Sequence, residues 1–74
     1  MKPLDQLDAA ETGHWLLEMK RSLAAHAASL PGSSNPWEIR AAMNTHLLLL
    51  REMAALRPER REEIESLIGK YERK

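Results

Sequence analysis

One cluster of turn-forming residues divides an otherwise helix-forming chain. Residues 31–36 read Pro-Gly-Ser-Ser-Asn-Pro, and no comparable cluster occurs elsewhere in the 74 residues. Because proline and glycine interrupt helices while serine and asparagine favour turns, we expect the chain to reverse here. A second interruption is Pro58, which disfavours the α conformation in Arg57. The chain is therefore predicted to form two long helical segments followed by a third, shorter one.

The composition favours helices on both sides of these breaks. Leucine and alanine are the most frequent residues, and valine and phenylalanine are absent. Leu, Ala, Met, Glu, Arg and Lys form helices readily, whereas strands prefer the β-branched and aromatic residues that are scarce here. We predict an all-α fold for residues 1–74, a single small domain. Its architecture is an antiparallel helical hairpin plus a third shorter helix, a small three-helix bundle.

Local signals place the helix starts. Asp8 with Glu11 three residues later has the spacing of a capping box, although Gly13 interrupts the apolar pattern and leaves a start at Thr12 as an alternative. The second helix has a favoured N-cap residue in Asn35, followed by Pro36 at the first helical position. Asp5 is a second candidate N-cap, so these signals predict a first helix that begins near Leu4, at Ala9 or at Thr12, and a second that begins at Pro36.

The middle of the second segment is apolar almost all round once Leu47 and Leu49 are added to its two seams. Its first seam reads Ile39, Met43, His46, Leu50 and Met53, and its second reads Trp37, Ala41, Asn44, Leu48 and Ala55. A helix of this kind is buried on several sides, and two neighbours from a short chain would cover it only in part. We therefore expect self-association, most simply a homodimer, with Leu48 in the outer contact.

No residue pattern indicates catalysis, a cofactor or a metal. The chain has no cysteine and no glycine-rich phosphate loop. Glu11 and His14 have the Glu-x-x-His spacing of di-iron bundles, but the second pair that such a site needs is missing. His46 is interpreted as a core or interface histidine, with a pH-sensitive contact as the alternative. We predict that the protein is not an enzyme and has no cofactor.

The charge balance argues against a general nucleic-acid role. Eleven basic residues balance eleven acidic ones, so no overall basic field attracts phosphate. The runner-up function is nonetheless a small nucleic-acid-associated regulator that uses Arg57, Arg60 and Arg61.

The longest apolar run, residues 47–50, is far too short to cross a bilayer. Acidic residues near Met1, where a signal peptide would be apolar, predict a cytoplasmic protein. Abundant arginine and alanine favour a bacterial or phage source.

The few large side chains suggest where a partner would bind. Trp15 and Trp37 are expected to pack together across the turn, and the alternative is that Trp37 is exposed and anchors a partner. The candidate partner-binding residues are Trp37, Leu48, Met53, Arg57 and Tyr71. The predicted function is an α-helical protein–protein interaction module, acting as an adaptor, a chaperone or a small inhibitor of a larger protein.

The arrangement around the turn resembles one known family. A long helix, a proline-bounded turn that ends in Ser34-Asn35-Pro36, and a second helix are similar to the needle subunits of type III secretion systems. That resemblance implies a helical hairpin. The family's turn is Pro-x-x-Pro, whereas Pro31 and Pro36 are five positions apart and a further helix follows Pro58, so no function is carried over.

Overall fold

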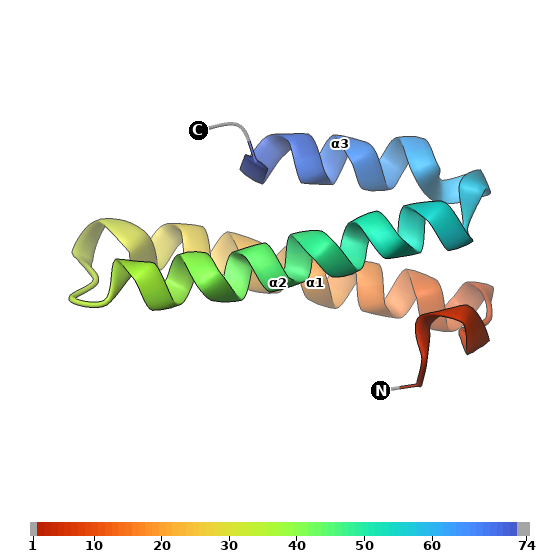
Figure 1. Cartoon of the computed structure of the whole chain (residues 1–74), viewed down its shortest axis with the longest axis horizontal. Coiled ribbons are helices and arrows are strands. Elements are labelled where there is room, and N and C mark those ends of the chain that lie inside the picture. The colour runs from red at the N-terminus through yellow and green to blue at the C-terminus, as the bar shows by residue number, and fades with distance from the viewer. Residues whose placement is uncertain (1, 73–74) are drawn as a thin grey trace.

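The protein is a bundle of three α-helices. The structure, a computed structural model, describes residues 2–72. A hairpin of two long helices is followed by a shorter helix that folds back along it (Figure 1), which confirms the predicted all-α bundle. A short 3₁₀ turn precedes each helix. The helices are α1 (Ala9–Ser29), α2 (Pro36–Leu56) and α3 (Arg61–Glu72), and the turns are η1 (Leu4–Gln6), η2 (Leu30–Gly32) and η3 (Pro58–Arg60).

The predicted capping box opens α1. The Glu11 backbone N–H donates to Asp8 Oδ1 at 2.8 Å, and the Asp8 N–H donates to Glu11 Oε1 at 3.1 Å. Lys2 Nζ lies 2.9 Å from Glu11 Oε2; this contact raises the pKa of Lys2 and is the largest cause of the lowered pKa of Glu11. The helix therefore begins at Ala9, and the alternative starts near Leu4 and at Thr12 are wrong.

The helix continues through Gly13 without a break. No glycine among residues 2–72 has a positive φ, so an ordinary residue could adopt the backbone conformation found there. The guanidinium of Arg60, the last residue of η3, lies beside this glycine, where an added Cβ would be 3.4 Å from Arg60 Nη2. Gly13 thus costs helix propensity, and an added Cβ would meet the arginine side chain at an ordinary contact distance.

The turn between the long helices is held mainly by backbone groups. Asn35 is the N-cap of α2 as predicted, but its side chain makes no capping hydrogen bond. Its carbonyl instead accepts from the N–H groups of Glu38 and Ile39, at 3.1 and 3.4 Å. The Ser33 hydroxyl accepts from the Asn35 N–H at 3.0 Å. Pro36 has no backbone N–H, and this costs nothing at the first position of a helix because an N–H there would have no partner within the helix.

The core forms around α2, which contacts both other helices. In Figure 1 it runs between α1 and α3, and η1 folds against it near the end of the hairpin. Four large side chains from the three helices have less than 2 % of their surface exposed: Leu23, Leu50, Met53 and Ile64. Burying a side chain of this size contributes about 1.5–3 kcal/mol. The central helix therefore supplies the contacts that join the whole bundle.

The predicted break at Pro58 is present. Arg57 adopts φ −129° and ψ 74°, outside the helical region, and ends α2. The chain then turns through η3, and α3 starts at Arg61. Ile64 and Ile68 face the core from α3. The proline thus converts what could be one long helix into two that pack against each other.

We predict that Gly13→Ala stabilises the protein by roughly 0.5–1 kcal/mol, since alanine gains helix propensity and its methyl group makes only an ordinary contact with a flexible arginine. Urea unfolding monitored by circular dichroism measures the change. Gly69→Ala is the matched control, because nothing lies within 4 Å of the Cβ it would add in α3. A loss of stability in Gly13→Ala alone would mean that Arg60 is held rigidly against α1.

Candidate partner-binding surface

One face of α2 is left uncovered by the rest of the chain. Every member of the second sequence seam is exposed, and we call these residues the outer stripe: Trp37, Ala41, Asn44, Leu48 and Ala55. Trp37 exposes 64 % of its surface and Leu48 exposes 66 %, the two largest values among the exposed large apolar residues of the described chain. The first seam, in contrast, faces α1 and α3. The first seam therefore packs against the other helices and the second is exposed to solvent. Their apolar character alone did not predict this difference.

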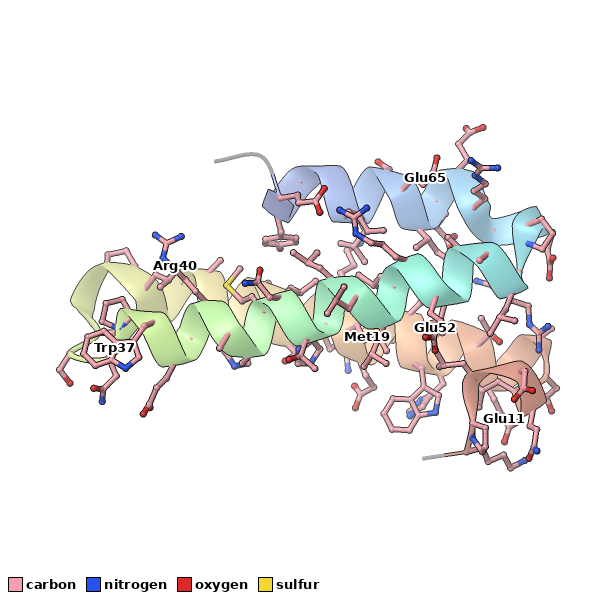
Figure 2. All side chains as sticks on the ribbon, in the orientation of Figure 1. Glu11, Met19, Trp37, Arg40, Glu52 and Glu65 are labelled. Atoms are coloured by element: carbon pink, nitrogen blue, oxygen red, sulfur yellow. The ribbon has the colours of Figure 1, made fainter. Side chains whose placement is uncertain are left out.

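The two tryptophans do not pack together. Trp15 makes an edge-on contact with His14, with ring centroids 5.4 Å apart, and packs against the core. Figure 2 shows Trp37 at the turn end of the hairpin, whereas Glu11, one turn before Trp15, lies at the opposite end. The helix between Trp15 and the turn spans roughly 20 Å. The expected pairing is wrong, and the alternative of an exposed Trp37 is the one that the structure contains.

The other apolar candidates lie apart from this stripe. Met53 exposes 1 % of its surface and belongs to the core. Tyr71 in α3 is half-buried against the core, with Lys70 Nζ 5.6 Å from its ring centroid. Of the five candidates, only Trp37 and Leu48 share one surface. Burial is the property that separates Met53 from Leu48, and it depends on which seam the neighbouring helices cover.

The run of four leucines shows how far the chain covers its own central helix. Leu47 and Leu50 are buried, and Leu49 is half-buried against the core. Leu48 alone in this run points to solvent. Two neighbouring helices thus cover three leucines and leave one side of α2 open.

Arg57 has a structural contact rather than a free guanidinium. Its Nη2 donates to the carbonyl of Leu7, a residue fifty positions earlier in the chain. Leu7 itself is 2 % exposed and packs in the core beside Leu4. A charged donor on a carbonyl forms one of the stronger kinds of hydrogen bond. Arg57 therefore fastens the N-terminal turn to the junction between α2 and α3.

The neighbouring arginines form ion pairs within α3 and its leading turn. Arg60 Nη1 lies 3.2 Å from Glu63 Oε1, and Arg61 Nε lies 2.9 Å from Glu65 Oε2. The hydrogen bond with Glu65 raises the pKa of Arg61. With Arg57 on Leu7, all three arginines of the nucleic-acid alternative have partners within the chain.

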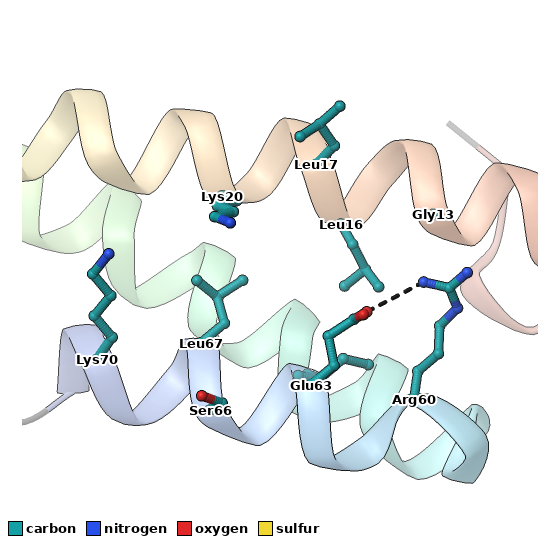
Figure 3. Close-up of a pocket in the computed structure, with 10 residues that line it drawn as sticks. Gly13, Leu16, Leu17, Lys20, Arg60, Glu63, Ser66, Leu67 and Lys70 are labelled. Atoms are coloured by element: carbon teal, nitrogen blue, oxygen red, sulfur yellow. Dashed lines mark hydrogen bonds and ion pairs between the residues drawn. The ribbon is translucent and has the colours of Figure 1, made fainter.

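A groove between α1 and α3 was not predicted. Its volume is about 400 Å³, and Leu16, Ile64 and Leu67 are among its apolar lining residues. Figure 3 shows Lys20 and Lys70 toward one end and the Arg60–Glu63 pair toward the other. The groove exists because α3 packs mainly on α2 and touches α1 less closely. No local sequence pattern could indicate the groove, because the residues on its two sides are forty or more positions apart in the chain.

The Glu-x-x-His spacing of Glu11 and His14 has a cause other than metal binding. Glu11 is engaged by Asp8 and Lys2, and His14 is exposed beside Trp15. No three or more metal-binding side chains come together in residues 2–72. The Glu-x-x-His spacing here belongs to a capped helix start.

Comparison with known proteins finds no matching family model, no matching curated protein and no matching solved structure. Within the part of the chain that the structure describes, no helix combines the length and the apolar composition needed to cross a bilayer.

We predict that Arg57→Ala lowers the free energy of unfolding by about 1–2 kcal/mol, because a half-buried carbonyl loses a charged donor. Arg61→Ala, which removes an exposed pair between neighbouring helical turns, is the matched control and should change stability little. Chemical denaturation of both variants makes the comparison. Equal losses of unfolding free energy in the two variants would show that the contact with Leu7 contributes no more than an exposed ion pair.

Proposed function

We propose that this protein is an α-helical binding module that docks on a larger protein through the outer stripe of α2. The observation that carries the proposal is the exposure of Trp37 and Leu48 on the one helix that the bundle otherwise buries. Isolated apolar residues on a surface are ordinary, but two large ones on a stripe of small residues form a shaped surface. An adaptor, a chaperone or a small inhibitor would use such a surface.

The spacing of the stripe suits a helical partner. From Trp37 to Ala55 the stripe covers eighteen positions, roughly 27 Å at the rise of an α-helix. Ala41 and Ala55 are small enough to let a second helix approach closely, and Trp37 and Leu48 project on either side of Ala41 along the stripe. Charged residues of both signs flank it, including Glu38, Arg40 and Glu52, all exposed. This arrangement favours an apolar centre with a polar rim, the usual anatomy of an interface.

The stripe is also rigidly presented. On its opposite side, α2 packs against the other helices through its own buried residues Met43, Leu50 and Met53. A preformed helix loses little backbone entropy when it binds, and this loss is one of the main costs of association. The same surface supports self-association, since a second copy offers a matching stripe, and we propose a homodimer as the form taken when the partner is absent.

A nucleic-acid-associated regulator remains the second candidate, with Arg57, Arg60 and Arg61 as its contacts. Each of these guanidinium groups would first have to leave the partner that it has in the folded chain. A salt titration distinguishes the two functions, because phosphate contacts weaken steeply with added salt whereas an apolar interface does not.

We predict that Trp37→Ala leaves the melting temperature nearly unchanged and weakens partner binding by one to two orders of magnitude. The ring is largely exposed in the free protein, and its burial on binding contributes on the order of 2–3 kcal/mol. Melting by circular dichroism and a titration against the partner purified with the wild type give both quantities. A lower melting temperature with normal affinity in the folded fraction would remove Trp37 from the site.

We predict that Leu48→Glu remains folded but self-associates more weakly at tens of micromolar, where we expect the wild type to form dimers. A carboxylate in the middle of an apolar contact loses its hydration without gaining a partner. Leu17→Glu is the matched control, because Leu17 is an exposed leucine on α1, outside the stripe. Sedimentation equilibrium of the three proteins decides the point. A monomeric wild type would exclude the homodimer, and dissociation by Leu17→Glu would move the contact to α1.

A further inference from the structure

Two of the three histidines face each other across the helical hairpin. His26 lies near the end of α1 and His46 lies in the middle of α2, and their ring centroids are 5.9 Å apart with an interplanar angle of 48°. Both side chains are half-buried at the junction of the two helices. His14, the third histidine, is an exposed residue of the first turns of α1 and contacts Trp15 instead.

The hydrogen bonds of the two rings define which nitrogen carries the proton. His26 Nδ1 lies 2.7 Å from the carbonyl oxygen of Ser22, and His46 Nδ1 lies 2.7 Å from that of Ala42. A carbonyl oxygen can only accept, so Nδ1 must be the donor in both rings. In each neutral imidazole the remaining nitrogen, Nε2, therefore has an unprotonated lone pair.

Neither Nε2 atom has a hydrogen-bond partner among the residues that the structure describes. Every buried side-chain nitrogen or oxygen in that part of the chain has a hydrogen-bond partner. Atoms without a partner are therefore not buried. Each Nε2 atom therefore keeps some exposure to solvent.

We propose that His26 and His46 bind one divalent transition-metal ion, of the Zn²⁺, Ni²⁺ or Cu²⁺ type, through their Nε2 atoms. Two imidazoles on one tetrahedral ion, at Zn–N distances of about 2.0–2.1 Å, have ring centroids roughly 5.2 Å apart. The observed separation of 5.9 Å is wider, so binding one ion requires the two rings to approach each other by roughly 0.7 Å. Imidazole is the ligand that these ions prefer, and Ca²⁺ and Mg²⁺ prefer oxygen.

The surroundings of the rings are those of metal-binding histidines in general. Such histidines donate their other N–H to a backbone carbonyl or a carboxylate, and this bond sets the tautomer and the ring orientation. Here both carbonyls come from the preceding turn of the same helix. Two protein ligands leave at least two positions for water, so we expect an exchangeable ion rather than a permanent structural one. The bound ion would also fasten α1 to α2.

The proposal is tested on the full chain with ZnCl₂, and with CuCl₂ as a second probe. Isothermal titration should give one ion per chain, with Cu²⁺ bound more tightly than Zn²⁺. When free ion exceeds its Kd a hundredfold, the melting temperature should rise by on the order of 10 °C. His26→Gln and His46→Gln should each lower the affinity at least tenfold and abolish the rise, while His14→Gln, the matched control, should bind as the wild type does.

Three results would overturn the assignment. Unchanged affinity in His26→Gln or His46→Gln would show that the pair is not the site. Loss in His14→Gln equal to that in the other variants would indicate binding to surface histidines in general. One ion per two chains, with metal-induced dimers in sedimentation, would place the two ligands on different molecules. Melting each variant without metal separates lost binding from lost folding.

Discussion

The burial of α2 between two helices of its own chain is the constraint on which the rest of the structure depends. Leu50 and Met53 are almost completely buried, and Leu23 from α1 and Ile64 from α3 meet them in the core. In so small a chain, two neighbours cannot surround a third helix. One face of α2 must therefore stay in solvent, and Trp37 and Leu48 lie on that face among charged residues such as Arg40 and Glu52.

The N-terminal turn and the α2–α3 junction complete the bundle together. Pro58 ends the helical run, and Arg57 reaches back to the carbonyl of Leu7. This single hydrogen bond joins segments from the two ends of the sequence, next to the core positions of Leu4 and Leu7. Around it, Arg60 and Arg61 are paired with acidic neighbours. Basic and acidic side chains thus form local ion pairs in this region. The outer stripe is the apolar feature that α2 exposes.

Local features were predictable because their causes lie within a few residues. The capping box of Asp8 and Glu11, the turn before Pro36 and the break at Arg57 each follow from side chains and backbone preferences at short range. The three-helix count follows from these breaks. The same reasoning recognised that Leu48 belongs to a different seam from Leu50. It placed Met53 among the binding residues, although Met53 lies in the core, because periodicity does not say which seam a neighbour will cover.

The sequence by itself determined the helices, their order and their limits apart from the start of the first helix, since helix propensity, capping and proline breaks act along the chain. Only the tertiary structure decided that Trp37 stands free of Trp15, that Arg57 meets Leu7, and that His26 faces His46. Each of these depends on the rotation of one helix against another. That rotation is set by how the side chains of the whole core interlock, so no short stretch of sequence contains it.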